Sequence, residues 1–101
     1  MTPPFSKDTY RKNAAIYKLM GNPKRLAILN YLKRGEVAAG ELVKVMKLPK
    51  ANVSQNLSNL KWAHLVRARR VGKNVYYRLV DPAIVDLCDL LNKLRKRKII
   101  H

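Results

Sequence analysis

Residues 50–60, KANVSQNLSNL, place amide and hydroxyl side chains close together in a strongly basic chain. Such residues have modest helix propensity and compete with the backbone for hydrogen bonds, so local folding alone does not favour them. Their neutral groups both donate and accept, which suits them to the edges of base pairs: amides can pair bidentately with adenine, and hydroxyls can serve either role. The side chains with this chemistry are Asn52, Ser54, Gln55, Asn56, Ser58 and Asn59.

The spacing of apolar residues predicts that a helix over residues 50–62 carries this stretch. Val53, Leu57 and Leu60 follow one another at helical intervals and form one core-facing stripe. A helix turns by about 100° per residue, which defines the remaining faces. The residues expected to point away from the core are Ala51, Gln55, Ser58 and Trp62, with Asn52, Ser54 and Asn59 on the flanks.

Three further helices are predicted before this one. The first spans residues 8–20 and ends at Gly21, and the second starts with Asn22 as N-cap and Pro23 at its first position, ending at Gly35. The third lies within AGELVKVMKL, residues 39–48, with Leu42, Val45 and Met46 on one side. Pro49 closes it, and residues 49–51 are expected to form the turn into the polar helix.

Two antiparallel strands, residues 65–71 and 74–80, are predicted after the polar helix, joined by a turn at Gly72 and Lys73. This hairpin is basic. A last helix opens at Asp81 and Pro82 and carries a wide apolar band before the basic tail KLRKRKIIH. With the first helix, this band is the expected surface for a second subunit. The interface residues predicted are Tyr17, Ile84, Leu87, Cys88, Leu91 and Leu94.

Composition indicates one small intracellular domain. The chain has 101 residues, of which 48% are hydrophobic, and we expect residues 1–101 to form a single domain. No apolar run is long enough to cross a bilayer, and the N-terminus has no apolar signal segment, so we expect a soluble, cytoplasmic protein. The single cysteine, Cys88, excludes an intrachain disulfide and suits a reducing cytosol.

The charge balance points to a polyanionic partner. Lys and Arg total 22 against 6 Asp and Glu, giving a formal net charge of +16. Nucleic acid is the first candidate for such a protein. An anionic membrane surface is the alternative, but membrane binding usually shows as one basic amphipathic helix or a polybasic run, whereas this charge is spread along the chain.

A short helix, a tight turn, a polar-faced helix and a basic hairpin together predict a winged helix-turn-helix: a mostly α fold with a β-hairpin wing. In that motif the second helix enters the major groove, so the neutral face would discriminate bases while charges elsewhere supply affinity. The alternatives are a solvated polar face, a weakly specific architectural DNA-binding protein, or a winged helix that binds RNA or protein. The predicted contacts to double-stranded DNA are Lys50, Asn52, Ser54, Gln55, Asn56, Ser58, Asn59, Arg69, Arg70 and Lys73.

From Tyr17 to Leu91 the chain resembles the ArsR-type (arsenical-repressor) family of small winged-helix repressors. LMGNPKRLAILNYL is similar to that family's second helix, VSQNLSNLKWAHLV to its recognition helix, and RRVGKNVYYRLVDP to its wing. The resemblance implies a homodimer paired through the first and last helices. It also implies binding to an inverted-repeat operator and release by an effector.

The family's sensor motifs are missing from this sequence. Ala38 and Gly40 stand where the arsenic-sensing branch has its cysteine pair, and Asn30 stands where the persulfide-sensing branch has its first cysteine. In the zinc-sensing motif that begins D-x-H, Ala83 replaces the histidine, and Leu94 and Arg97 replace the later ligands. We therefore expect no metal or other cofactor, and the effector stays unknown.

Two positions near the polar helix depart from the family pattern and affect geometry. His64 follows the helix where the family usually has glycine, so a positive φ is expected there. Pro49 replaces the usual serine N-cap, so one N–H of the helix loses its side-chain acceptor.

The remaining chemically active side chains have ordinary explanations. Lone His64 and His101 lack partner ligands, and Cys88 is best explained as a small apolar residue, with a redox contact across a dimer as the alternative. Asp86 and Asp89 could hold a cation between subunits, but Asp89 is better explained by pairing with Lys93. Trp62 is expected to cover the hairpin, stack on it or brace a phosphate. No motif indicates an enzyme.

Overall fold

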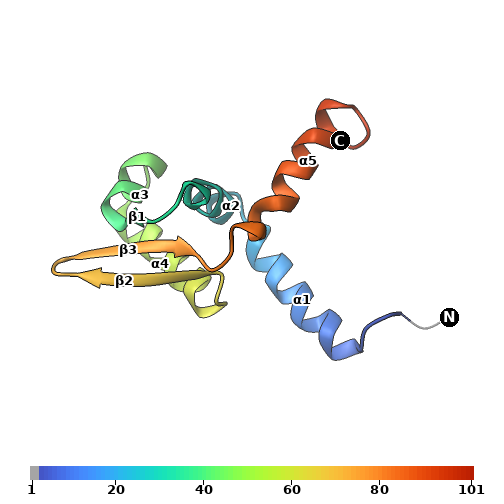
Figure 1. The fold of residues 1–101 in the computed structure, drawn as a ribbon, viewed down its shortest axis with the longest axis horizontal. Helices are drawn as coiled ribbons and strands as arrows, with labels where there is room; N and C mark the ends of the chain where they lie inside the picture. Colours follow the sequence, from blue (N-terminus) through green and yellow to red (C-terminus); the bar gives the residue numbers. More distant parts are fainter. Residues whose placement is uncertain (1–2) are drawn as a thin grey trace.

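The computed structural model describes residues 3–101 of the chain. A helical body and a small sheet lie at one end, and the first and last helices project from the other (Figure 1). Along the chain the elements are α1 (Lys7–Met20), α2 (Pro23–Tyr31), the 3-10 turn η1 (Leu32–Arg34), β1 (Val37–Ala38), α3 (Ala39–Met46), α4 (Lys50–Trp62), β2 (Val66–Val71), β3 (Asn74–Leu79), the 3-10 turn η2 (Pro82–Val85) and α5 (Asp86–Lys96).

The predicted capping residues begin and end the early helices. The Asn22 side chain accepts hydrogen bonds from the backbone N–H groups of Lys24 and Arg25 at 2.9 and 3.2 Å, and Pro23 occupies the first position of α2. Gly21 ends α1 by donating its N–H to the Tyr17 carbonyl at 2.8 Å. These local signals confirm the predicted boundary between the first two helices.

Two helices differ from the predicted boundaries because their ends tighten into 3-10 turns. The second helix stops at Tyr31 and continues as η1 up to Gly35, whose φ of 126° favours glycine. Asp81 and Pro82 open the last helical segment as predicted, but its first turn is the 3-10 turn η2. Asp81 caps that turn by accepting from the Ala83 N–H at 2.9 Å, and the α-helix itself begins at Asp86.

The core lies among α2, α3, α4 and the base of the hairpin. The stripe of α4 is confirmed: Val53, Leu57 and Leu60 are at most 1% exposed. The prediction for α3 is partly wrong, because Val45 is 43% exposed while Val43 packs against the core. The buried apolar side chains are Ile28, Leu29, Leu32, Val37, Leu42, Val53, Leu57, Leu60, Leu65, Val66, Leu79 and Val85.

The sheet has three antiparallel strands in the order β1-β3-β2. The predicted hairpin is confirmed, with Val66 opposite Leu79 and Val71 opposite Asn74. The two-residue strand β1 was not predicted; it pairs Val37 with Tyr77 on the other side of β3. This contact ties the hairpin base to the chain that enters α3.

The helices α1 and α5 are poorly covered within one chain. Neither contains a buried residue, and Tyr17, Leu87 and Leu91 are 66%, 53% and 37% exposed. The radius of gyration is 15.5 Å, whereas a compact domain of this length has one of about 12.7 Å. The excess reflects the two projecting helices, whose apolar surface a second subunit would bury.

Candidate nucleic-acid interface

The connection between α3 and α4 sets the position of the polar helix. Lys47 ends α3 in the left-handed conformation, with φ 54°, and Pro49 stands at the N-cap of α4 without a side-chain hydrogen bond, as expected. The predicted turn at residues 49–51 is displaced, because Lys50 and Ala51 already belong to α4. The turn is therefore formed by residues 47–49.

The exposed face of α4 carries most of the predicted polar side chains. Ser54, Gln55 and Ser58 are exposed, and Asn52 and Asn59 lie half-buried at its edges. Gln55 Nε2 donates to Asn59 Oδ1 at 3.3 Å, one turn further along the same helix. These five residues form one neutral hydrogen-bonding surface, and Lys50 adds a positive charge at its N-terminal end.

Asn56 does not belong to this surface, and its prediction as a DNA contact is wrong. The side chain is only 8% exposed and points into the interface between α4 and α2. It accepts from Arg25 Nε at 3.3 Å, and it donates to the main-chain carbonyl and to Oδ1 of Asn52 at 3.0 and 2.9 Å. A buried amide needs such partners, so the polar atoms of Asn56 are occupied by hydrogen bonds inside the protein.

The hairpin carries exposed positive charges that differ in their partners. Arg70 and Lys73 are exposed, and Gly72 forms the turn with a φ of 60°. Arg69 is instead held by Glu36, with nitrogen–oxygen distances of 2.6 and 3.1 Å, and its guanidinium lies 5.4 Å from the centre of the Tyr76 ring. Arg69 thus has an acidic partner on the protein, and its contact with DNA stays a prediction.

The Arg69–Glu36 pair also changes the ionisation of the carboxyl group. The hydrogen bonds from Arg69 hold the pKa of Glu36 below its ordinary value, and the same contact raises the pKa of Arg69. Both groups stay charged at neutral pH. The pair therefore fixes the hairpin against the loop before β1 and leaves little net charge at that point.

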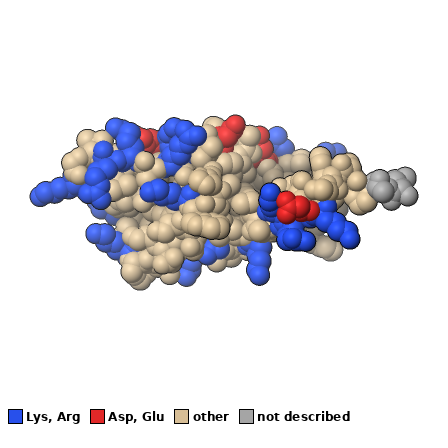
Figure 2. All heavy atoms as spheres, turned by 90° about the horizontal axis from the view of Figure 1, so that it is seen from below, with Lys and Arg blue, Asp and Glu red and all other residues tan. Residues whose placement is uncertain are grey.

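A cleft of about 500 Å³ separates α4 from the hairpin. Lys50 and Ser54 line it from α4, Lys73 from the hairpin turn and Lys44 from α3. Its lining contains no acidic side chain, so the field within it favours an anion. Lys44 was missed by sequence reasoning, since only the packing of α3 against α4 brings it here. Lys and Arg side chains also protrude at the hairpin end in Figure 2.

The predicted dimer surface is largely brought together in a hollow of about 410 Å³ between α1, α2 and α5. It contains Cys88, which is half-buried. Leu94 lies outside this hollow, further along α5. Asp89 forms a salt bridge with Lys33 of η1, so the predicted pairing with Lys93 is wrong. The predicted interface residues in the hollow are Tyr17, Ile84, Leu87, Cys88 and Leu91.

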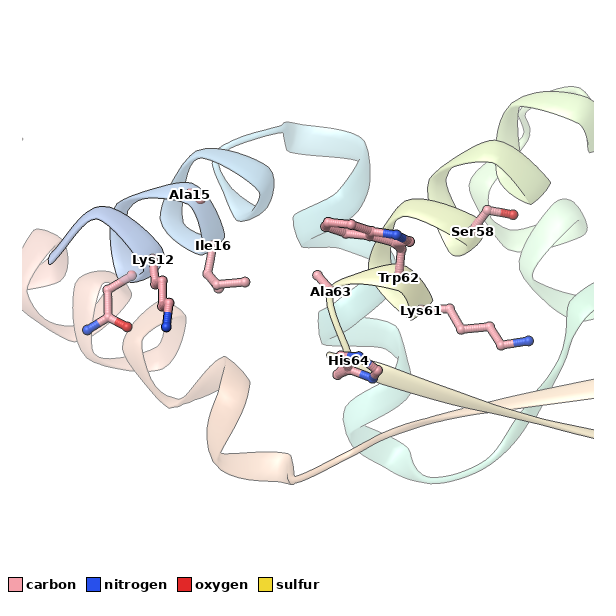
Figure 3. A pocket seen from close by; sticks show the side chains of 9 residues that line it. Lys12, Ala15, Ile16, Ser58, Lys61, Trp62, Ala63 and His64 are labelled. Atoms are coloured by element: carbon pink, nitrogen blue, oxygen red, sulfur yellow. The ribbon is translucent and has the colours of Figure 1, made fainter. Parts of the chain in front are cut away.

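Trp62 does not cover the hairpin. Figure 3 shows its side chain at the end of α4, between that helix and α1, and it is 85% exposed. With Lys12, Ile16 and His64 it lines an open hollow of about 810 Å³. His64 has a φ of 60°, as its position predicted, and this left-handed residue directs the chain from the helix into β2.

Within residues 3–101, no helix combines the length and apolar character needed to span a bilayer. In the same part of the chain, no three His, Cys, Asp or Glu side chains gather where they could hold a metal ion together.

The fold and this surface define a winged helix-turn-helix protein, and comparisons with known proteins agree. Residues 22–68 match the model of bacterial regulatory proteins of the arsR family. The chain is 35% identical to the transcriptional repressor SmtB homolog of Synechocystis sp., a match that spans 82% of this chain and 63% of that protein.

Solved structures of other proteins share this architecture. Rv0081 of Mycobacterium tuberculosis has a TM-score of 0.80 and 32% identity, and the match covers 93% of this chain and 95% of that one. The homodimeric winged helix-turn-helix DNA-binding domain Mb0332 of Mycobacterium bovis has a TM-score of 0.78 and 28% identity, and the match covers 100% of this chain and 95% of that one. The chain belongs to the arsR family of bacterial regulatory proteins, and through that membership it is a DNA-binding transcriptional regulator.

Proposed function

We propose that the protein is a repressor that binds an inverted-repeat operator as a homodimer. Each subunit would place α4 in the major groove, where Gln55 and its neighbours contact base edges, and would lay the hairpin along the adjacent backbone. The observation that carries this proposal is the neutral, exposed face of α4 beside a cleft walled by Lys44, Lys50 and Lys73. Such a surface combines base discrimination with attraction to phosphate.

The dimer is proposed to form through α1 and α5. Support comes from the exposed apolar side chains around Tyr17 and Leu91 and from the projection of both helices away from the core. A two-fold dimer presents two α4 helices, which must reach successive major grooves, so the half-sites should be centred about 34–36 Å apart. Because bacterial DNA lies in the cytoplasm, we place this DNA-binding regulator there as well. No catalytic activity is proposed.

The test is selection of bound sequences from a random duplex pool, followed by affinity measurements at about 0.15 M salt. We expect an inverted repeat to be selected and to bind at least about 10³-fold more tightly than random duplex. A ratio near one would favour the alternative, an architectural protein that coats DNA. That alternative draws on the net charge of +16 and on Ala38, Gly40 and Ala83, which stand where the sensor motifs have ligands.

A further inference from the structure

A chain of hydrogen bonds connects α2 to the edge of the proposed base-reading surface. Arg25 of α2 donates from Nε to Asn56 Oδ1 at 3.3 Å and from Nη1 to the Leu19 carbonyl at 3.3 Å. Asn56 donates from Nδ2 to the carbonyl and to Oδ1 of Asn52, at 3.0 and 2.9 Å. Arg25 and Asn52 are half-buried and Asn56 is buried, so the chain runs from the interior to the surface.

The chemistry of Arg25 allows only one orientation of the side-chain amides of Asn56 and Asn52. A guanidinium has donors and no acceptor, so Asn56 must turn its oxygen toward Arg25. The nitrogen of Asn56 then faces Asn52, where the main-chain carbonyl and the side-chain oxygen both accept from it. Asn52 must therefore direct Oδ1 inward. Its Nδ2, which donates to no protein acceptor within residues 3–101, is left on the outer side.

We infer that Arg25 and Asn56 are positioning residues that make Asn52 a hydrogen-bond donor at the DNA surface. Asn52 would then recognise a base edge that presents acceptors, such as N7 and O6 of guanine or O4 of thymine. The bidentate pairing of asparagine with adenine needs both Oδ1 and Nδ2 directed at the base, whereas the bond from Asn56 directs Oδ1 of Asn52 toward the interior. This inference rests on the proposed function of α4 as the base-reading helix.

The orientation is retained when DNA binds, because turning the Asn52 amide would set its Nδ2 against Nδ2 of Asn56. Two donors would then face each other, and the buried Asn56 nitrogen would lose its side-chain acceptor. Gln55 differs in this respect. Among residues 3–101 its side chain bonds only to Asn59, and no arginine there fixes the direction of that pair, so both amides can turn together.

The decisive variant is Asn56→Asp, which keeps the shape of the side chain and removes its donor. Its carboxylate can accept from both Arg25 and Asn52 Nδ2, so Asn52 should turn and present Oδ1 to DNA. Sequences are selected from a random duplex pool with the unmodified protein, Asn52→Ala and Asn56→Asp. We expect Asn52→Ala to abolish the base preference at one position in each half-site.

At that position the unmodified protein should prefer guanine or thymine on the contacted strand. Asn56→Asp should instead prefer a base that presents a donor, cytosine N4 or adenine N6, by at least about fivefold. Asn52 lies at the partly exposed end of the series of hydrogen bonds, and Asn52→Asp places an acceptor there directly, so it should shift the base preference in the same direction. It tests the inference even if Asn56→Asp does not fold.

Asn92→Asp on α5 is the matched control. It adds the same charge, keeps an acceptor for Arg95 Nη1, which lies 3.2 Å from Asn92 Oδ1, and should leave every base preference unchanged. The inference is overturned if folded Asn56→Asp or Asn52→Asp selects the same base as the unmodified protein, or if Asn52→Ala alters no position. If the unmodified protein selects no sequence at all, the proposed function itself has failed, which is a different result.

Discussion

Arg69 and Arg70 are neighbours on β2, but we expect Arg70 to contribute more than Arg69 to the salt dependence of DNA binding. Arg69 is already neutralised by Glu36 at 2.6 Å, whereas Arg70 is exposed and forms no ion pair within residues 3–101. Each phosphate neutralised by a protein charge adds about 0.9 to the slope of log K against log salt. Removing one such contact from both subunits of a dimer should therefore flatten the slope by up to about 1.8.

The same relation gives the expected loss of affinity. With Arg70→Gln, a slope change of about 1.8 corresponds to roughly 30-fold weaker binding at about 0.15 M salt and to almost none near 1 M. The matched variant Arg69→Gln should change the slope by less than half as much, although it releases the hairpin from Glu36. Operator binding is measured by fluorescence anisotropy at four or five salt concentrations.

Equal flattening by the two variants would refute this reasoning. It would mean that Arg69 leaves Glu36 when DNA binds and contacts phosphate itself. Random duplex should show the same slopes as operator, because phosphate contacts carry no direct sequence information. Thermal unfolding of both variants in the absence of DNA serves as the control for a folded hairpin.

Four other results are expected. Gln55→Ala should cost about 1–3 kcal/mol on the selected operator and little on random DNA, and equal losses on both would show that α4 does not discriminate bases. Leu91→Asp should give a monomer by sedimentation where the unmodified protein is a dimer; a monomeric unmodified protein would contradict both the dimer and the inverted repeat. The folded-state pKa of Glu36 is depressed, so its ion pair with Arg69 should stabilise the folded protein at neutral pH. That stabilisation should disappear as the pH falls below about 4.3 and through the folded-state pKa. Thermal unfolding at a series of pH values should show no such pH-dependent contribution in Glu36→Gln. Zinc, arsenite and cadmium should not dissociate the protein from its operator, and a metal-dependent dissociation that Cys88→Ser abolishes would show that Cys88 belongs to a metal site.

Local sequence was sufficient to predict most of the helices and the hairpin. The capping signal of Asn22 and Pro23, the end of α1 at Gly21 and the turn at Gly72 act within a few residues of where they lie in the chain. Periodicity likewise predicted the buried stripe of α4, because a helix has a fixed rotation per residue. The candidate interface followed from that stripe, since the polar residues opposite it had to face outward.

Contacts between distant segments decided what the sequence could not predict. The strand β1 exists only because Val37 and Ala38 meet β3, and two isolated residues carry no strand pattern. Asn56 stands three residues after Val53 and four before Leu60, so helical spacing already puts it at the edge of the core-facing stripe, and Arg25 gives its buried amide a partner. Arg69 resembles its neighbour Arg70 in type, yet Glu36 holds it on the hairpin. Sequence alone thus determined the fold class, the order of elements and the polar face of α4, because those depend on local periodicity and turns. Tertiary structure alone decided which side chains on that face and on the wing stay available to DNA, because a hydrogen bond or salt bridge depends on where a distant partner is placed.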